Sequence, residues 1–325
     1  MIATPVLNKI LTGALVAQAL LVAVIYWPRG DTKVESADLV PLDAATADRI
    51  TIQGRTAVGE VPADPLVLTR KPTGWVVESE SSYPADDTMM TEVVLAPLDL
   101  LVGHSPIATK DHSHAALDVA ADQHSRKVII ESSEGTQTLY IGSSQGNAVH
   151  ARVAGEPSVF RVKGLSAFGL PERGVYVYDR DFQKVAVDTV TALTIHRPGE
   201  PDIALTQGEE GWALQHPPPN TTVDQQKARD FVHATLNLRM MEPHGTVVTP
   251  EMGLDDRAVL VSWTTDDGGV SSTQSYRVGA EIQGESGRRF FQAQGSPFVL
   301  ELLNGNLQHA VKRPAAEFLV ASGSR

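Results

Sequence analysis

The sequence predicts an α+β protein: two tandem copies of a mainly antiparallel sheet with one principal helix each, preceded by one transmembrane helix. Three observations support this fold class. Nineteen residues without a charge lie between Lys9 and Arg29. A strand pattern around a Gly-Trp pair occurs twice. In each copy, one stretch with the apolar spacing of a helix is flanked by segments that alternate like strands.

The composition excludes several classes of protein. With 325 residues, of which 42% are hydrophobic and 20% charged, the chain can form one large or two ordinary domains. It has no cysteine, which excludes disulfide scaffolds, cysteine nucleophiles, iron–sulfur clusters and thiolate zinc sites. A net charge of -12 repels phosphate, so we expect no nucleic acid partner.

The uncharged run is the candidate membrane anchor. At about 1.5 Å per residue it spans roughly 28 Å, close to the hydrocarbon core of a bilayer. Ile10, Leu20 and Val24 are its apolar anchor residues, and Tyr26 and Trp27 stand where an interfacial aromatic belt lies. No small-x-small site follows Val24, which favours an uncleaved signal anchor over the two alternatives, a cleaved signal peptide and a buried core helix.

This interpretation predicts a single-pass protein of the cytoplasmic (inner) membrane, in contact with the lipid bilayer. A short amino-terminal tail without an acidic residue is most simply left in the cytoplasm, which places the C-terminal domain in the periplasm. Lys9 precedes the uncharged run and Arg29 and Lys33 follow it, so charge alone does not decide the orientation.

An internal repeat defines the expected domains. The Gly-Trp pair at Trp75 recurs at Trp212, 137 residues later, and the same offset pairs Gly142 with Gly279. Constant spacing, with length changes only in Gly-, Ser- and charge-rich loops, indicates a tandem duplication. We therefore predict a tail and anchor at residues 1–30, a linker at 31–44, a first α+β repeat at 45–180 and a second at 181–325.

Each copy has the same expected order of elements. Strands are expected at 50–53, 65–78 (a hairpin), 127–131, 137–141, 148–153 and 158–162, and in the second copy at 193–196, 202–215 (a hairpin), 258–263, 273–278, 289–293 and 297–302. One helix follows each hairpin; Asp86, Asp87 or Thr88 can cap the first, and Thr222 or Asp224 the second. Pro97 would kink or end the first helix, so we expect that copy to be irregular.

The order of these signals resembles a family of membrane-anchored bacterial proteins. The most specific stretches are KPTGWVVES, LYIGSSQGNAVHARVAGEPSVFRV and VDTVTALTI, and the resemblance covers residues 40–320. This family, which the chain resembles in these stretches, is known as domain of unknown function 4340. Its members often accompany ABC-type exporter subunits similar to the gliding-motility auxiliary proteins. The resemblance therefore implies an ABC-type permease and ATPase, or other envelope proteins, as partners, and it carries over no catalytic residue.

No motif identifies a reaction. The strings nearest to a nucleophile elbow, around Ser166 and at residues 142–146, have the wrong spacing, and no phosphate-binding loop follows a strand. The acid pairs that begin at Asp86, Asp255 and Asp266 fit helix caps and turns better than a calcium site. We expect neither a catalytic residue nor a cofactor.

The unusual local cluster is histidine. His104, His112, His114 and His124 are four of the ten histidines, and they are candidate ligands for zinc or copper or a candidate pH-responsive group. The segment resembles an exposed loop, and its counterpart keeps only His244, so we expect no tightly bound metal. The two repeated tryptophans could stack on a sugar, but their equivalent positions favour the core.

Two functions from different classes follow. The first is a non-enzymatic, membrane-anchored extracytoplasmic accessory or scaffold protein of an ABC-exporter-like complex. The alternative is a periplasmic ligand-binding module that holds a glycan, lipid or metal in a cleft between the repeats. An enzyme of unrecognised type comes third. An exposed apolar patch or an uncovered sheet edge favours the scaffold, and a deep cleft with convergent acids or histidines favours the other two.

Overall fold

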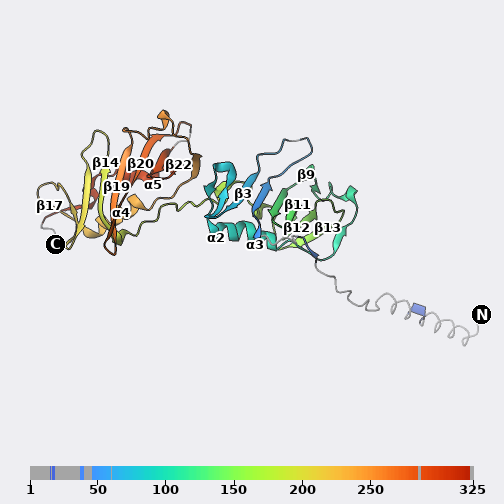
Figure 1. Cartoon of the computed structure of the whole chain (residues 1–325). Helices are drawn as coiled ribbons and strands as arrows, with labels where there is room; N and C mark the ends of the chain where they lie inside the picture. The colour runs from blue at the N-terminus through green and yellow to red at the C-terminus, as the bar shows by residue number, and fades with distance from the viewer. Residues whose placement is uncertain are drawn as a thin grey trace, which may run out of the picture.

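The structure is a computed structural model that describes residues 15, 17, 18, 37–39, 46–59, 61–284 and 287–322. Two lobes follow each other along the chain and lie side by side (Figure 1). We call the part from β1 to β13 the first lobe and the part from β14 to β23 the second lobe.

A nine-stranded antiparallel sheet forms the first lobe, in the order β5-β4-β3-β2-β10-β11-β12-β13-β7. Its strands are β2 (Arg49–Gln53), β3 (Leu66–Lys71), β4 (Gly74–Val77), β5 (Tyr83–Pro84), β7 (Pro106–Ala108), β10 (Arg126–Ser132), β11 (Gly135–Gln145), β12 (Ala148–Val153) and β13 (Val159–Lys163). Two short pairs complete the lobe: β1 (Ala37–Asp38) with β6 (Val102–Gly103), and β8 (Val119–Ala120) with β9 (Gln123–His124).

An eight-stranded antiparallel sheet forms the second lobe, in the order β16-β15-β14-β19-β20-β21-β22-β18. Its strands are β14 (Val190–His196), β15 (Ile203–Gly208), β16 (Gly211–Leu214), β18 (Glu242–Gly245), β19 (Val259–Asp267), β20 (Val270–Glu281), β21 (Arg288–Ala293) and β22 (Val299–Leu303). A separate pair joins β17 (Thr221–Val223) to β23 (Leu319–Ala321).

The two large sheets share one strand order. The series β4-β3-β2-β10-β11-β12-β13-β7 corresponds position by position to β16-β15-β14-β19-β20-β21-β22-β18, and β5 is an addition to the first sheet. The strands expected from the sequence are all present in the two sheets. A duplicated chain would have the same strand order in both sheets. The duplication itself and the domain boundaries stay predictions.

The predicted α+β class is wrong, because the described residues are mostly β-sheet. The expected principal helix of the first lobe is a series of short pieces: α2 (Asp87–Met90), a π-helical turn (Thr91–Leu95) and α3 (Ala96–Asp99), which contains Pro97. The second lobe has α4 (Gln225–Leu236) and an unexpected further helix, α5 (Asn304–Val311). The α+β class was predicted from one clear helical pattern in each half of the sequence. Long strands such as β11 and β20 make the described residues mostly β-sheet instead.

The predicted transmembrane helix is a second correction. Within the described residues, no helix is long and apolar enough to cross a membrane. This finding contradicts the predicted single-pass location in the inner membrane with a periplasmic domain, which rested on the length and hydropathy of one run. The proposed anchor residues Ile10, Leu20, Val24, Tyr26 and Trp27 lie outside the described residues.

Each sheet packs one face against its helices, and most buried apolar side chains of the two lobes belong to one continuous cluster. The side chain of Asp224 caps α4 by accepting a hydrogen bond from the main-chain N–H of Lys227, and Asp86 caps α2 through Met89 in the same way. Where the lobes meet, the rings of Tyr83 and Phe298 pack edge to face, with centroids 5.0 Å apart.

The outer edge of the Gly-Trp strand is closed differently in the two lobes. In the first lobe, β5 pairs with β4, and the N–H of Ala85 donates to the carbonyl oxygen of Trp75. In the second lobe, the main-chain N–H of Trp212 donates to Oε1 of Gln225 at 2.6 Å, and Nε2 of Gln225 donates to the carbonyl oxygen of Trp212 at 3.0 Å. A side-chain amide has the donor and acceptor of a peptide group, so Gln225 replaces a paired strand.

The two repeated glycines allow a loop to approach the sheet closely. A Cβ at Gly142 would collide with the carbonyl oxygen of Leu117, and a Cβ at Gly279 would collide with that of Met252. Space at the strand, rather than an unusual φ, therefore explains why glycine stands at both positions.

We expect Gln225→Ala to lower the free energy of unfolding by about 1 to 3 kcal/mol, because it leaves two partly buried main-chain groups of Trp212 without partners. Gln226→Ala is the matched control: that side chain is exposed and bonds only Asp230, so the change should stay within about 0.5 kcal/mol. Urea denaturation measures both. Equal losses would show that the Gln225 amide does not close the edge.

Candidate functional site

Strand β20 is longer than its neighbour β21, and this difference defines the candidate site. The pairing of β20 with β21 ends at Tyr276 opposite Ala293, with one further hydrogen bond from the N–H of Gln294 to the carbonyl oxygen of Ser275 at 2.8 Å. On its other side, β20 pairs with β19 down to Val270. Residues 270–274 therefore have β19 on one side and, within the described chain, no strand on the other.

The free side of this overhang presents main-chain hydrogen-bonding groups. In antiparallel sheets, successive residues direct their N–H and C=O groups alternately toward the two neighbouring strands. Since Ser275 directs its carbonyl toward β21, Thr273 and Ser271 direct their main-chain groups to the same side. In the part of the chain that the structure describes, these groups have no main-chain partner.

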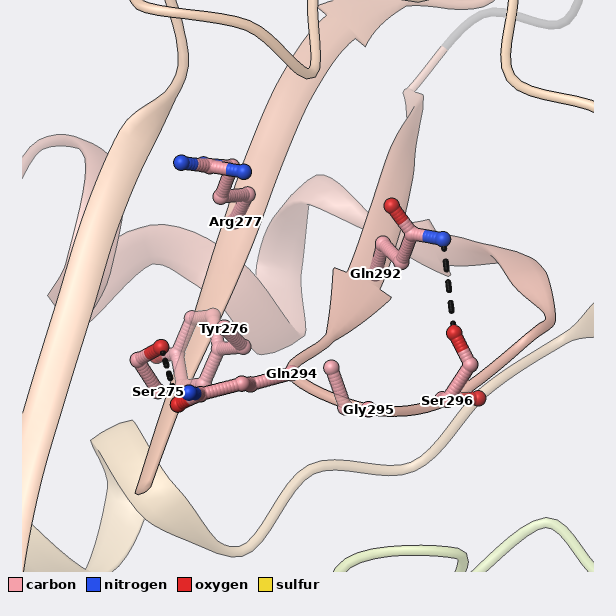
Figure 2. Close-up of a pocket in the computed structure, with 8 residues that line it drawn as sticks. Ser275, Tyr276, Arg277, Gln292, Gln294, Gly295 and Ser296 are labelled. Atoms are coloured by element: carbon pink, nitrogen blue, oxygen red, sulfur yellow. Dashed lines mark hydrogen bonds between the residues drawn. The ribbon is translucent and has the colours of Figure 1, made fainter. Parts of the chain in front are cut away.

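The turn after β21 ends the pairing. Gly295 has a φ of 77°, which lets the chain leave the sheet directly after Gln294. Figure 2 shows Gln294 reaching across toward Ser275 before the chain departs through Gly295 and Ser296. The hydroxyl of Ser275 donates to Oε1 of Gln294 at 2.9 Å, and this bond fixes the last contact between the strands.

Two hollows flank this last contact. The hollow of about 310 Å³ in Figure 2 is lined by Arg277 and Gln292 among others. The second hollow, of about 450 Å³, lies between the overhang and residues 182–185 of the segment that connects the lobes. The two share Ser275, Ala293 and Gln294 as lining residues. We call the second hollow, together with the free edge of residues 271–274, the β20 groove.

The β20 groove combines aromatic rings with polar groups that, apart from Lys184, carry no charge. Its lining residues are Phe182, Gln183, Lys184, Val185, Trp263, Thr273, Gln274, Ser275, Ala293 and Gln294. Trp263 is only 3% exposed, and its indole Nε1 is buried without an acceptor in the described chain. A buried donor without a partner carries a free-energy penalty.

In the first lobe the strand edge ends in the same way, but the hollow beside it is filled. The pairing of β11 with β12 ends at Leu139 opposite Val153, with one further hydrogen bond from the N–H of Ala154 to the carbonyl oxygen of Thr138. Gln137 on β11 lies opposite Ile130, as Gln274 on β20 lies opposite Trp263. Nε2 of Gln137 donates to the carbonyl oxygen of Leu39 at 2.7 Å, and the Leu39 side chain is buried there. Gln274 has no such bond in the described residues and lines the groove instead. The two lobes therefore differ in the hollow beside the edge and not in the edge itself.

The structure does not gather the four candidate histidines at one point. His104 and His112 are exposed, whereas Nε2 of His114 lies 3.0 Å from the carbonyl oxygen of Pro157 and Nδ1 of His124 lies 3.1 Å from that of Ala120. Among the described residues, no group of three or more histidines, aspartates or glutamates is placed to hold a metal ion. That the segment binds no tight metal stays a prediction.

The repeated tryptophans lie in the core cluster rather than in a groove. Trp75 and Trp212 are each 6% exposed, so neither ring offers a free face to a sugar. Trp263, Thr273 and Gln274 were not predicted as site residues, because the expected strand begins at residue 273 and so leaves out most of the overhang. The signal that could have revealed it is the unequal length of two consecutive strand patterns.

The fold and the groove define a two-lobed, mainly antiparallel β protein with an open strand edge. The family model described as Domain of unknown function (DUF4340) matches residues 75–251, and the chain belongs to this family. The family expected from the sequence is thus confirmed, and the matched range takes in parts of both lobes. No curated protein and no solved structure matches the chain.

We expect the fold to lose stability as the pH falls below about 6.5, the ordinary pKa of histidine. Burial lowers the pKa of His124, and Lys127 lowers it further, against opposing effects of the Ala120 carbonyl, Asp118 and Asp122. The unfolded chain therefore binds more protons than the folded chain below that pH, and the stability present above it is lost. His124→Gln should reduce this loss between pH 7 and pH 5 in urea denaturation. An unchanged pH dependence would contradict the assignment to His124.

Proposed function

We propose that this protein is a non-enzymatic accessory module that binds another protein through the β20 groove. The free edge at residues 271–274 carries the proposal. Unpaired main-chain groups on an exposed strand readily pair with an extended segment of another chain, which then continues the sheet. The neighbouring hollow of about 450 Å³ gives side chains of that segment a place to pack.

The edge lacks the usual protection against such pairing. Sheets commonly guard their edges with lysine, proline or a covering element. Residues 270–275 read VSSTQS and contain neither a charge nor a proline, and Val270 at the tip is 71% exposed. In the first lobe the corresponding side chain, Gln137, is bonded to the carbonyl oxygen of Leu39, whereas Gln274 lines an open hollow beside the edge, which supports a role for this hollow in the second lobe.

The partner class follows from the family resemblance, which makes ABC-exporter-like permease or ATPase subunits the first candidates. The net charge of -12 favours a partner with a basic surface. Asp266 and Asp267 at the end of β19 add two carboxylates beside the edge, so a basic residue near the added strand would be attracted there.

A ligand-binding module is the second candidate. Aromatic rings combined with amide and hydroxyl groups also suit a neutral sugar, and Trp263, Gln274 and Thr273 supply these groups in one hollow. The two functions require different atoms. An added strand needs the main-chain N–H of Thr273, whereas a sugar needs the side chains.

Thr273→Pro tests the proposal. Proline removes the outward N–H, which has no partner among the described residues, so the hairpin with β19 should remain folded. Thr273→Ala is the matched control, because it loses the same hydroxyl contact with Thr264 but keeps the N–H. In affinity purification with the full chain, wild type and Thr273→Ala should recover the same exporter-like subunit, and Thr273→Pro at least about tenfold less.

Circular dichroism and thermal melts confirm that both variants are folded. Equal recovery by Thr273→Pro and Thr273→Ala would exclude strand addition at this edge. If Gln274→Ala then abolished binding of a purified glycan while Thr273→Pro retained it, the ligand-binding function would replace the scaffold function.

A further inference from the structure

A separate cavity in the second lobe lies beside β15 and β16, at the opposite end of the sheet from β18. It has a volume of about 650 Å³, within the range of ligand-binding pockets. Most of its wall is apolar, including Ile203, Leu214, Pro314 and Leu319. The guanidinium of Arg197, which also lines it, is already bonded to the carbonyl oxygens of His309, Ala310 and Arg313.

The ring of Tyr178 stands at the equivalent position in the first lobe. There, Tyr178 forms a bridge with Ala85, as Leu319 pairs with Val223 in the second lobe. The rings of Tyr83 and Tyr178 meet edge to face at 5.8 Å, and the ring of Phe298, which the second lobe contributes, packs on Tyr83 at 5.0 Å. A polar hollow of only about 260 Å³ remains beside Tyr178.

The second lobe has an aliphatic side chain where the first has this ring. Leu319 stands in place of Tyr178, because it pairs with Val223 as Tyr178 bridges Ala85. No phenylalanine, tyrosine or tryptophan of the described chain lines the larger cavity. The space beside Leu319 is about 650 Å³, against about 260 Å³ beside Tyr178.

We propose that this cavity binds an aromatic side chain, phenylalanine or tyrosine, that a second polypeptide presents. The occupant follows from the first lobe, where the ring of Tyr178 stands in the place of Leu319 and narrows the equivalent hollow. An apolar wall stabilises a buried ring through the area removed from water. Asp202 and His216 also line the cavity and provide hydrogen-bonding partners for a tyrosine hydroxyl.

The test uses small probes, so its result is independent of the β20 groove and of any particular partner. N-acetyl-tyrosine amide is titrated into the full chain while NMR follows the methyl signals of Ile203, Leu214 and Leu319. We expect saturable shifts with a Kd on the order of 1 mM, because a single side chain has few atoms in contact. N-acetyl-leucine amide should bind at least about threefold more weakly.

Leu319→Tyr restores the residue of the first lobe and should weaken binding of the tyrosine probe at least about tenfold, because its ring fills the cavity. Val270→Thr, at the hairpin tip beyond the β20 groove, is the control and should bind as wild type. If Leu319→Tyr does not fold, Ala315→Phe fills the same cavity from the 3-10 turn Ala315–Phe318.

Three results would overturn the proposal. Absence of saturable shifts at about ten times the expected Kd would show that the cavity does not accept a ring. Equal or tighter binding of the leucine probe would assign it to an aliphatic ligand. Undiminished binding in the cavity-filling variant would place the tyrosine probe elsewhere on the protein.

Discussion

An edge strand must place its outward N–H and C=O groups against a partner, and this requirement shapes both lobes. A strand inside a sheet satisfies these groups through its neighbours, but the last strand does not. At one end of each sheet the edge strand contains a proline, Pro106 in β7 and Pro243 in β18, which removes a donor. At the other end, β5 covers β4 in the first lobe and the amide of Gln225 covers β16 in the second.

The overhang of β20 is neither covered by a strand of the described chain nor broken by a proline, and β11 ends its pairing with β12 in the same way. The lobes differ beside this edge, because Gln137 is bonded to the carbonyl oxygen of Leu39 whereas Gln274 lines an open hollow. The cavity beside β15 shows a similar contrast, because the first lobe has the ring of Tyr178 where the second has Leu319. These differences between the lobes support the proposed binding surfaces better than the features that the lobes share.

The sequence was sufficient for the strands and insufficient for the contacts between them. Alternation and aromatic residues predicted the long strands of the two sheets, because a half-buried strand imposes a period of two, but the short edge strands β5, β7 and β18 were not predicted. The fold class was wrong, since α5 has little helical pattern in NGNLQHAV and the lengths of β11 and β20 do not follow from local signals. The predicted family was confirmed, because its most specific stretches lie within strands and their turns.

The candidate site could not be predicted without knowing the register of the strands. Trp263 and Gln274 are brought together by cross-strand pairing, and the sequence alone gives no such register. Proximity in the sequence was misleading for the histidines, since His114 and His124 bond different carbonyl oxygens and His104 and His112 point to no common centre. Gln225 illustrates the same limit: its amide replaces a strand, which no local pattern predicts.

Two open surfaces on one lobe fit the energetics of a modest docking interaction better than one surface alone. Each main-chain hydrogen bond to an added strand contributes about 0.5 to 1.5 kcal/mol, because water already bonds the free groups. An overhang of five residues offers few such bonds, and association itself costs several kcal/mol. Burying one aromatic ring in a cavity adds about 1.5 to 3 kcal/mol. A partner that supplied both a strand for β20 and a ring for the second cavity would combine two weak contacts, with the rigid sheet between them fixing the distance that the partner must span.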